Sequence, residues 1–564
     1  MASINRSLHL FFTTSPRSPH WMEPDLQIIN DKFIGHEWNK KTQYEFMSTL
    51  VESEHFAGKG PKDPELAARD RITRGPKSLG FVDLKPTVQI TEVGKLFISS
   101  KRKEDILLRQ LLKFQLPSPY HTTNKDAKGD FWVKPYLEIF RLIKYFGSLS
   151  FVELQLFGLQ LTNYKNFDSI VNKIEEFRKE KALNKGQYKK FLFDYQTKVV
   201  SEVFYKEIAE KNFQTRESKT ENLKSFVKKK IRTMRDYADA CTRYLRATGL
   251  INISQRGRSL SIIKEKIVVV DHFLDNVSRD PIFTTIKEEK SFKDYLFNPE
   301  QPILYTDNRT NLIQHIQSIE PSYETSALKE MSLHRLKDIS FELLEIKKEA
   351  IISNKIHNIK AYKEYDDIKN TYNDIRNKDL YDLPLMFEWN TWRAMTMLNG
   401  GRISGNFILD DQGDPISTAP GNQGDIMCDY GDFGLLVEVT LSSGAKQYDM
   451  EGESVSRHLG KFRKEINKDS YCLFIAPKIN ENVITHFFTL YHLNLNMHGG
   501  YAYIVPLSLD VFEKMVEDSY KADTVPTPHD IKRLFEYSKN QAKSGINEVD
   551  WFEKINEKAL SWLD

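Results

Sequence analysis

Two acidic residues, Asp425 and Glu438, lie thirteen positions apart, each in a strand-like run of the sequence. The turn residues Tyr430-Gly431-Asp432 separate the two runs. We therefore expect antiparallel strands whose ends bring both carboxylates together. Converging carboxylates are what oxygen-preferring Mg²⁺ requires, and such an ion activates water and neutralises charge on a scissile phosphate. The pair indicates metal-dependent hydrolysis of phosphodiester bonds.

Strand periodicity leaves two interpretations of Glu438. Val437 and Val439 point to one face of the predicted strand 433–442, and Glu438 points to the other. In a half-buried strand, such a glutamate is either a solvated residue of the outer face or a functional acid. The Gly-Asn-Gln-Gly loop before Asp425 favours the functional interpretation, because glycines let the backbone approach a phosphate closely.

Further polar residues could belong to the same site, but each also has a structural interpretation. Glu451 and Glu453 could supply a further ligand, or they could be surface charges at the start of a helix, where acids are favoured. His458 could orient water or touch nucleic acid, although a lone histidine is more often structural. Glu388 lies on an amphipathic, aromatic-rich helix, and its spacing does not decide between a site acid and a surface acid.

The composition is that of an ordinary soluble, multidomain protein. Its 564 residues are too many for one hydrophobic core and predict three or four domains. The net charge of +3 comes from 81 basic and 78 acidic residues, so a nucleic-acid surface requires local clustering. The three cysteines have neither metal-site nor disulfide spacing. Because no apolar run has the length of a signal or membrane segment, we expect a cytoplasmic protein.

The first half of the chain predicts two modules for DNA recognition. Residues 1–135 contain a predicted hairpin, 79–94, followed by a helix over 105–116. Residues 136–275 end in a helix over 237–251 and a hairpin that turns at Arg256-Gly257. A helix combined with a hairpin is the pattern of a winged-helix module, so we predict one such module in each region.

The second half predicts a linker and an α/β domain. Residues 276–380 are richly charged and predict a pair of long helices that act as a linker. Residues 381–564 alternate helices with strands, including buried-strand candidates at 471–477 and 501–509. The predicted fold class is therefore multidomain α+β, with a mixed sheet in the C-terminal domain.

Basic residues cluster in the two predicted recognition modules. Such runs are usually solvated helix faces, but on modules of DNA-binding type they favour contact with phosphates. The segment SPRSP (15–19) adds an extended, proline-stiffened arm that could enter a groove. The candidate DNA-binding residues are Arg17, Arg69, Arg71, Arg74, Lys77, Lys229, Arg232, Arg235, Arg243 and Arg246.

Two other activities lack their sequence motifs. The chain has no G-x-x-x-x-G-K-[ST] loop, which argues against ATP-driven translocation. The segment PSPY (117–120) lacks the paired prolines of a methyltransferase loop, and no glycine-rich cofactor loop accompanies it. The protein is expected to use neither ATP nor a methyl donor.

Eight segments, spread in one order over almost the whole chain, match a known family. They are TSPRSP, DPELAARDRITRGPKSLGF, LLKFQLPSPYH, RDYADACTRYLRATGL, FEWNTWRA, TAPGNQGDI, VEVTLSSGAKQYDMEGESVSRH and YCLFIAPKI. Through them the chain resembles the AlwI-like family of bacterial Type IIS restriction endonucleases, in particular the MlyI and PleI branch and the related nicking endonucleases. The resemblance implies an N-terminal recognition region, a helical linker and a C-terminal nuclease domain of the PD-(D/E)XK fold.

The resemblance also implies Mg²⁺-dependent cleavage of double-stranded DNA a few nucleotides outside a short asymmetric site, GAGTC in the nearest branch. By motif, the implied metal ligands are Asp425, Glu438 and Val439. The same motifs make Glu451 and Glu388 further acids of the site, and His458 an auxiliary residue.

One position departs from the superfamily pattern. Thr440 stands where the superfamily usually has a lysine. The water-activating group is therefore open: Lys446 could reach in from the following loop, or the metal ions alone could generate hydroxide.

One active centre per chain leaves the second DNA strand to another nuclease domain. Transient homodimerisation or a separate small subunit could supply it, whereas a strand-specific nickase would lack it. Two further classes are a DNA-binding protein with an inactive nuclease domain, against which the intact acidic pair argues, and a structure-specific repair nuclease. A double-strand cutter also implies a cognate methyltransferase as a separate protein.

Overall fold

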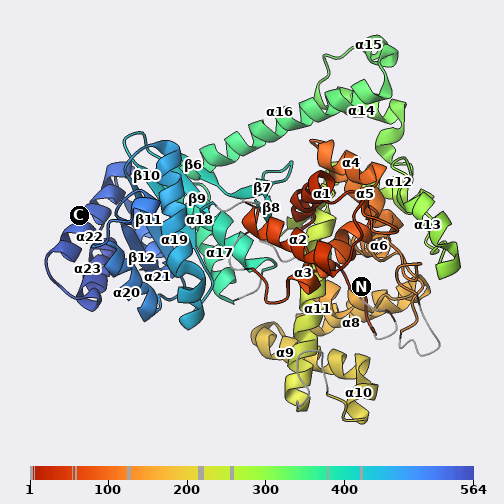
Figure 1. Ribbon diagram of the computed structural model, residues 1–564, viewed down its shortest axis with the longest axis horizontal. Helices are drawn as coiled ribbons and strands as arrows, with labels where there is room; N and C mark the ends of the chain where they lie inside the picture. Colours follow the sequence, from red (N-terminus) through yellow and green to blue (C-terminus); the bar gives the residue numbers. More distant parts are fainter. Residues whose placement is uncertain are drawn as a thin grey trace. The chain divides into compact units, whose positions relative to one another are not determined.

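The chain folds as two compact units. The computed structural model describes residues 4, 7–53, 55–56, 60–122, 129–213, 222–254, 259–377, 380–399, 401–419 and 423–564. The N-terminal unit takes its described residues from 1–52 and 60–344, and the C-terminal unit takes its own from 53–59 and 345–564. The boundary falls inside the long helix α16 (Leu333–Lys360), drawn in green in Figure 1. The finer division into four domains stays a prediction.

The N-terminal unit is built mainly of helices. Within the described residues, none of the helices of either unit combines the length and apolar character that crossing a bilayer requires. The α-helices of the N-terminal unit are α1 (Met22–Lys32), α2 (Lys40–Glu52), α3 (Pro64–Ile72), α4 (Glu92–Ser99), α5 (Glu104–Lys113), α6 (Pro135–Phe146), α7 (Phe151–Leu156), α8 (Phe167–Leu183), α9 (Tyr188–Val203), α10 (Tyr205–Ala209), α11 (Leu223–Arg246), α12 (Ile267–Asn276), α13 (Glu289–Leu296), α14 (Arg309–Ile319) and α15 (Thr325–Glu330).

The first predicted hairpin forms, with shorter strands than predicted. β1 (Val82–Asp83) pairs antiparallel with β2 (Gln89–Ile90). The second strand ends at Ile90 because the Thr91 hydroxyl accepts a hydrogen bond from Gly94 N at 3.0 Å and caps α4. The helix that follows, α5, buries Leu107 and Leu111 as its periodicity predicts.

The second predicted hairpin also forms. β4 (Ile251–Ser254) and β5 (Ser259–Ile262) pair antiparallel after α11, and β3 (Leu149–Ser150) extends the sheet in the order β3-β5-β4. The predicted turn at Arg256-Gly257 lies outside the described residues. Both hairpins therefore follow the predicted order of elements, while the winged-helix assignment stays a prediction.

An ion pair deep in the N-terminal unit joins α5 to the segment before α14. Arg109, 7% exposed, donates to both carboxylate oxygens of Asp307 at 2.7 and 2.8 Å, and Lys337 adds a contact at 2.7 Å. Burial raises the pKa of Asp307, but hydrogen bonds from Arg109 and Lys337 outweigh burial and hold the pKa at about 2. The carboxylate therefore stabilises the fold above its ordinary pKa of 3.8, and this contribution is lost as the pH falls towards 2.

We expect Asp307→Asn to lower the free energy of unfolding by about 3 kcal/mol at pH 7, because the buried guanidinium loses its counter-charge. Urea unfolding measures the change. The matched control is Glu342→Gln, which removes an exposed pair with Arg335 and should cost under about 0.5 kcal/mol. The difference between wild type and Asp307→Asn should shrink below pH 3.8, and a difference that does not change with pH would contradict the assignment.

The C-terminal unit contains the mixed sheet that the sequence predicts. Its strand order is β12-β11-β10-β9-β6. β10 pairs parallel with β11, and β11 pairs parallel with β12, whereas β9 pairs antiparallel with both β10 and β6. A separate hairpin, β7 with β8, precedes β9. The strands are β6 (Arg402–Gly405), β7 (Phe407–Leu409), β8 (Pro415–Thr418), β9 (Ile426–Asp429), β10 (Gly434–Val439), β11 (Ser470–Ala476) and β12 (Ile504–Ser508).

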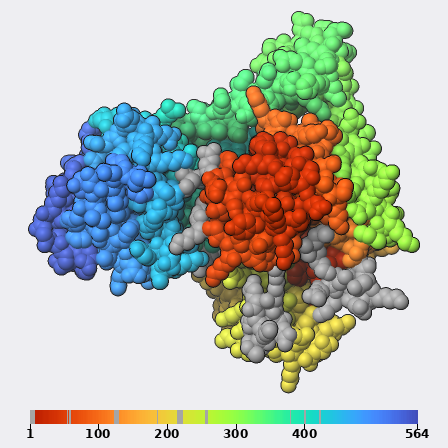
Figure 2. Space-filling view, in the orientation of Figure 1, coloured from red at the N-terminus to blue at the C-terminus, as the bar shows by residue number. Residues whose placement is uncertain are grey.

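Helices surround this sheet. α16 and α17 correspond to the predicted pair of long helices, and α18, α19, α20 and α21 all contact the sheet (Figure 1). The space-filling view in Figure 2 shows the C-terminal residues of this unit in blue. The α-helices are the end of α16, then α17 (Tyr365–Asn377), α18 (Leu383–Asn399), α19 (Ala445–Ile466), α20 (Glu481–Leu490), α21 (Leu509–Lys521), α22 (Pro528–Lys543) and α23 (Glu548–Leu560).

The central position of β10 decides how Glu438 is to be interpreted. Five of its six residues are buried, Glu438 among them at 5% exposure. A strand that pairs on both edges and is covered by helices has no solvated face. The structure therefore excludes the solvated interpretation of Glu438.

Candidate active site

Asp425 and Glu438 converge at one end of the β9–β10 hairpin. The last paired residues of that hairpin are Ile426 and Val437, so the next position on each strand sets Asp425 opposite Glu438. Asp425 Oδ2 accepts a hydrogen bond from Val439 N at 2.8 Å, which holds its carboxylate against β10. At the other end, the chain reverses at Gly431, whose φ is 90°. The predicted hairpin and the predicted approach of its two acids are both present.

Glu438 is fixed by two neighbours. Its Oε1 lies 2.8 Å from Nδ1 of His458, which projects from α19. Gly424 packs against the same oxygen: a Cβ built on this glycine would lie 2.9 Å from Glu438 Oε1 and 2.3 Å from Leu436 Cδ1. The loop before Asp425 therefore needs a glycine at 424 for close packing around the carboxylate.

Two more acids, Glu451 and Glu388, interact electrostatically with this pair. Glu451, half-buried on α19, has its pKa raised by burial, while a hydrogen bond from Thr440 acts in the opposite direction. Glu388, half-buried on α18, has its pKa raised well above the ordinary value by burial and then by the charge of Asp425. The structure thus brings the predicted acids together, and Glu388 is a member of the cluster rather than a surface acid. Glu453 is exposed and pairs with Arg457 at 3.0 Å, as a surface charge would.

Burial and mutual repulsion both disfavour the ionised form of these carboxyls. Burial raises the pKa of Asp425 well above its ordinary value, and the charge of Glu438 raises it further. Burial likewise raises the pKa of Glu438, and Glu451 adds to that shift. A cation placed between Asp425 and Glu438 would relieve both effects.

The donor set suits a hard cation. Within the part of the chain that the structure describes, no three His, Cys, Asp or Glu side chains form a ready-made group of metal ligands. Mg²⁺ does not need such a group, because one or two carboxylates with water and substrate phosphate complete its six positions. Asp425 and Glu438 supply those carboxylates, and Val439 could add only its backbone carbonyl.

His458 has an environment that keeps it neutral. Burial, and then the nearby charge of Arg457, lowers its pKa to about 4, although Asp425 acts in the opposite direction. At neutral pH the ring and Glu438 are thus joined by a hydrogen bond between Nδ1 and Oε1. This contact places His458 beside the acids, where the sequence alone left it open between a structural and a functional role.

Thr440, which replaces the usual lysine, lies at the site, whereas Lys446 does not. Thr440, 8% exposed, accepts from Ser442 N at 3.1 Å and hydrogen-bonds Glu451. Lys446 is exposed in the first turn of α19. Thr440 therefore acts on the site through Glu451, and nothing in the described contacts brings Lys446 to the carboxylates.

Five of the predicted DNA-binding residues are at least partly accessible. Arg17, Arg69 and Arg232 are exposed, and Lys229 and Arg235 are half-buried. All five lie in the N-terminal unit. They keep their place as candidates for contact with phosphates.

The other five candidates are engaged within the unit. Three are ion-paired: Arg71 with the buried Asp25 at 2.6 Å, Arg74 with Asp70 at 2.5 Å and Arg243 with Asp239 at 3.0 Å. Two are buried: Lys77 lies over the ring of Tyr120 at 4.5 Å, and Arg246 is 2% exposed. Lys77 and Arg246 are thus part of the interior in this structure, which does not fit the prediction that they contact DNA directly. Arg71, Arg74 and Arg243 are half-buried and paired with acids of the same unit, and DNA contact by them stays a prediction.

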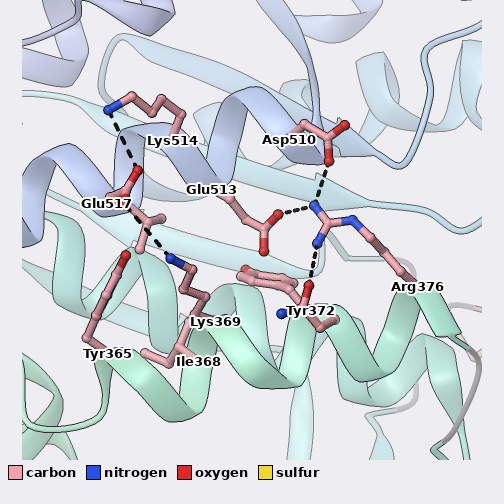
Figure 3. Close-up of a pocket in the computed structure, with 11 residues that line it drawn as sticks. Tyr365, Ile368, Lys369, Tyr372, Arg376, Asp510, Glu513, Lys514 and Glu517 are labelled. Atoms are coloured by element: carbon pink, nitrogen blue, oxygen red, sulfur yellow. Dashed lines mark hydrogen bonds and ion pairs between the residues drawn. The ribbon is translucent and has the colours of Figure 1, made fainter. Parts of the chain in front are cut away.

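A separate pocket of about 230 Å³ lies between α17 and α21 (Figure 3). Its charges face one another: Arg376 pairs with Asp510 at 2.6 Å and with Glu513, and Lys369 lies 3.8 Å from Glu517. These ion pairs connect the two helices across the pocket. The paired charges leave little net charge to attract a ligand. The carboxylate cluster remains the candidate active site.

Sequence reasoning singled out the Gly-Asn-Gln-Gly loop before Asp425, and the structure shows that its last glycine, Gly424, packs against Glu438. It missed one residue of the site region. Gln447, which is completely buried near the start of α19, has no sequence signal, because it stands among polar and charged residues.

Comparison with known proteins identifies the family. Residues 77–515, well over half of the chain, match the AlwI restriction endonuclease family. No match was found among curated proteins. The chain belongs to the AlwI restriction endonuclease family, and it is therefore a site-specific deoxyribonuclease that acts on DNA.

Two solved structures are similar to parts of the chain. The small subunit (R.BspD6I2) of the heterodimeric restriction endonuclease R.BspD6I is 28% identical over 35% of this chain and 95% of that subunit, with a TM-score of 0.28. The BpuJ1 endonuclease binding domain, crystallised with pyrene- and phenanthrene-modified DNA, is 15% identical over 50% of this chain and 91% of that domain, with a TM-score of 0.30. TM-scores this low carry no argument about the fold.

Proposed function

We propose that the protein is a Mg²⁺-dependent Type IIS restriction endonuclease, which cuts DNA at a fixed short distance outside a short asymmetric site. The observation that carries the proposal is the convergence of Asp425 and Glu438 at the end of β9 and β10. Asp425 and Glu438 would hold the ion, which would supply water activation and charge neutralisation at the scissile phosphate. The nuclease domain is proposed to have the PD-(D/E)XK fold.

The residues around the pair have supporting roles in this proposal. His458 holds the Glu438 carboxylate in place through Nδ1, and Thr440 orients Glu451. Glu388 and Glu451 add negative charge that strengthens binding of a cation. The cytoplasm of a bacterium, with a separate methyltransferase that protects the host, is the proposed setting.

The separation of the candidate residues between the two units supports cleavage outside the recognition site. All candidate catalytic residues lie in the C-terminal unit, and all candidate DNA-binding residues lie in the N-terminal unit. Recognition of DNA by one unit and cleavage by another allows the cut to lie outside the recognition site. Phosphate contacts by the N-terminal unit would set the register, and contacts with base edges would select the sequence.

Digestion of a supercoiled plasmid tests the proposal. With Mg²⁺ we expect ends at one constant offset from a single asymmetric sequence, and no product when EDTA is present. Ends within a symmetric site, ends without a shared sequence, or cleavage in EDTA would overturn it. Linear product would mean that a second copy or a small subunit cuts the other strand, whereas persistent open circles would identify a strand-specific nickase.

The Thr440 hydroxyl offers a more local test. We expect Thr440→Val to lower the cleavage rate roughly 10- to 100-fold, because groups that orient the acids of a metal site have effects of this size. Thr440→Ser, which keeps the hydroxyl, should restore most of the rate. The control is Thr371→Val in α17, which removes a buried hydroxyl that donates to Asp367 O at 2.8 Å. Equal loss of activity in both valine variants would point to general destabilisation.

A further inference from the structure

Gln447 connects the ends of two neighbouring strands. Its Nε2 donates to Ser442 O at 2.9 Å and to Lys478 O at 3.0 Å, and its Oε1 accepts from Asn480 N at 2.7 Å. Ser442 lies in the segment after β10, and the other two partners lie in the segment after β11. Because β10 and β11 run parallel, both segments leave the same edge of the sheet. One buried amide therefore joins the two chain segments at the edge where Glu438 lies.

The same side chain anchors the first turn of α19. The N-cap residue of this helix is Gly444, with φ 61°, and no side chain caps it. Buried polar groups hold a segment in one position when all their hydrogen bonds are satisfied, and both amide donors of Gln447 are used here. The start of α19 is thus held by the Gln447 amide rather than by a helix cap.

Two site residues extend from the same face of α19. Glu451 follows Gln447 by one helical turn, and His458 follows it by three, so the three side chains share one side of the helix. Glu451 hydrogen-bonds Thr440, and His458 contacts Glu438. A small rotation or shift of the helix start would move both groups relative to β10.

We propose that Gln447 is a positioning residue of the active site, which fixes α19 so that Glu451 and His458 stay against the metal-binding carboxylates. The inference rests on the proposed function, since it assigns to Gln447 an effect on the binding of a divalent ion. Gln447 itself touches neither the substrate nor the ion.

The test replaces Gln447 with methionine, which has similar volume and cannot form the three hydrogen bonds. The matched control is Gln115→Met in the N-terminal unit. Gln115 is 1% exposed, donates to Pro117 O and Ile282 O, and accepts from Ile282 N, so it makes the same set of bonds away from the site. Both variants should lower the Tm by similar amounts.

Two readouts separate positioning from simple stability. Calorimetric titration of the DNA-free protein with Mn²⁺ alone measures the affinity for the ion, and the Mg²⁺ concentration for half-maximal cleavage measures it during turnover. We expect Gln447→Met to weaken both about tenfold, the size of effect typical of groups that orient ligands, and Gln115→Met to leave both unchanged. Amide hydrogen exchange over residues 445–458 should speed up in Gln447→Met alone.

The metal-affinity measurements distinguish failure of the positioning role from failure of the proposed function. Unchanged metal affinity in Gln447→Met, with wild-type protein that binds Mn²⁺, would overturn the positioning role and leave the proposed function intact. Wild-type protein that neither binds Mn²⁺ nor depends on Mg²⁺ would overturn the proposed function itself. If Gln447→Met does not fold, Gln447→Asn, which keeps an amide but is one methylene too short to reach both segments, takes the same measurements with the same expectation.

Discussion

Asp425→Asn is expected to reduce DNA cleavage by about a thousandfold, the effect of removing a group that stabilises charge in the transition state, while DNA binding persists. Asparagine has the same shape as aspartate, and its amide oxygen can still accept the hydrogen bond from Val439 N. The change therefore removes one negative charge from the site and leaves the hairpin in place. Plasmid cleavage in Mg²⁺ and mobility shift of the DNA in Ca²⁺ measure the two properties separately.

The control for this variant lies on the same strand. Asp429, at the other end of β9, pairs with Lys468 at 2.7 Å away from the carboxylate cluster. Asp429→Asn should cut DNA at nearly the wild-type rate. If Asp425→Asn lost DNA binding together with cleavage, Asp425 would have a structural role, and if it cut normally, the assignment of the site would be wrong.

The same substitution should make the metal-free protein more stable. Burial, and then the charge of Glu438, raise the pKa of Asp425 above its ordinary value of 3.8, so above that pH the folded protein disfavours the ionised carboxylate relative to the unfolded chain. Asparagine carries no charge and avoids this cost. We expect a higher Tm for Asp425→Asn than for wild type at pH 7 in EDTA, and the difference should diminish as the pH falls and the wild-type carboxyl takes up a proton. A stabilised, inactive variant is what a site selected for activity predicts.

The sequence predicts well those features of the site that depend on residues close together in the chain. Asp425 and Glu438 belong to one hairpin, and a hairpin is set by two adjacent strands and the turn between them. The twelve residues between the two acids contain all of that information. The C-terminal α/β domain was predicted for a similar reason, because the strand candidates 471–477 and 501–509 alternate with helices that are close to them in the sequence.

Contacts between distant segments explain what the sequence did not settle. Alternation in β10 suggested a half-buried strand, but β10 pairs on both edges, with β9 and with the distant β11, and α18 and α19 pack against it. The role of Glu388 depends on how α18 packs against the sheet, which its helical spacing does not contain. Arg71 looked available for DNA, but its partner Asp25 lies 46 positions away. Charge patterns show that residues are basic and do not show which of them find an internal acid.

Gly424→Ala is expected to reduce cleavage about a hundredfold without preventing folding. The new methyl group would lie 2.3 Å from Leu436 Cδ1 and 2.9 Å from Glu438 Oε1, and both distances are too short for van der Waals contact. Overpacking of this kind costs about 1–3 kcal/mol of stability. Glu438 Oε1 is also the atom that contacts His458 Nδ1, so relief of the clash moves the carboxylate away from its position in the site.

Gly431→Ala in the same hairpin separates this effect from loss of stability. Gly431 has a φ of 90° and open space around its Cα, so alanine there is strained at the backbone but displaces no side chain. Forcing a non-glycine residue into the left-handed region costs about 1–2 kcal/mol. Both variants should therefore unfold at lower urea concentration, and only Gly424→Ala should lose cleavage at 25 °C. Equal cleavage by the two variants would show that the exact position of Glu438 does not limit the reaction, and the pair with His458 would then be structural.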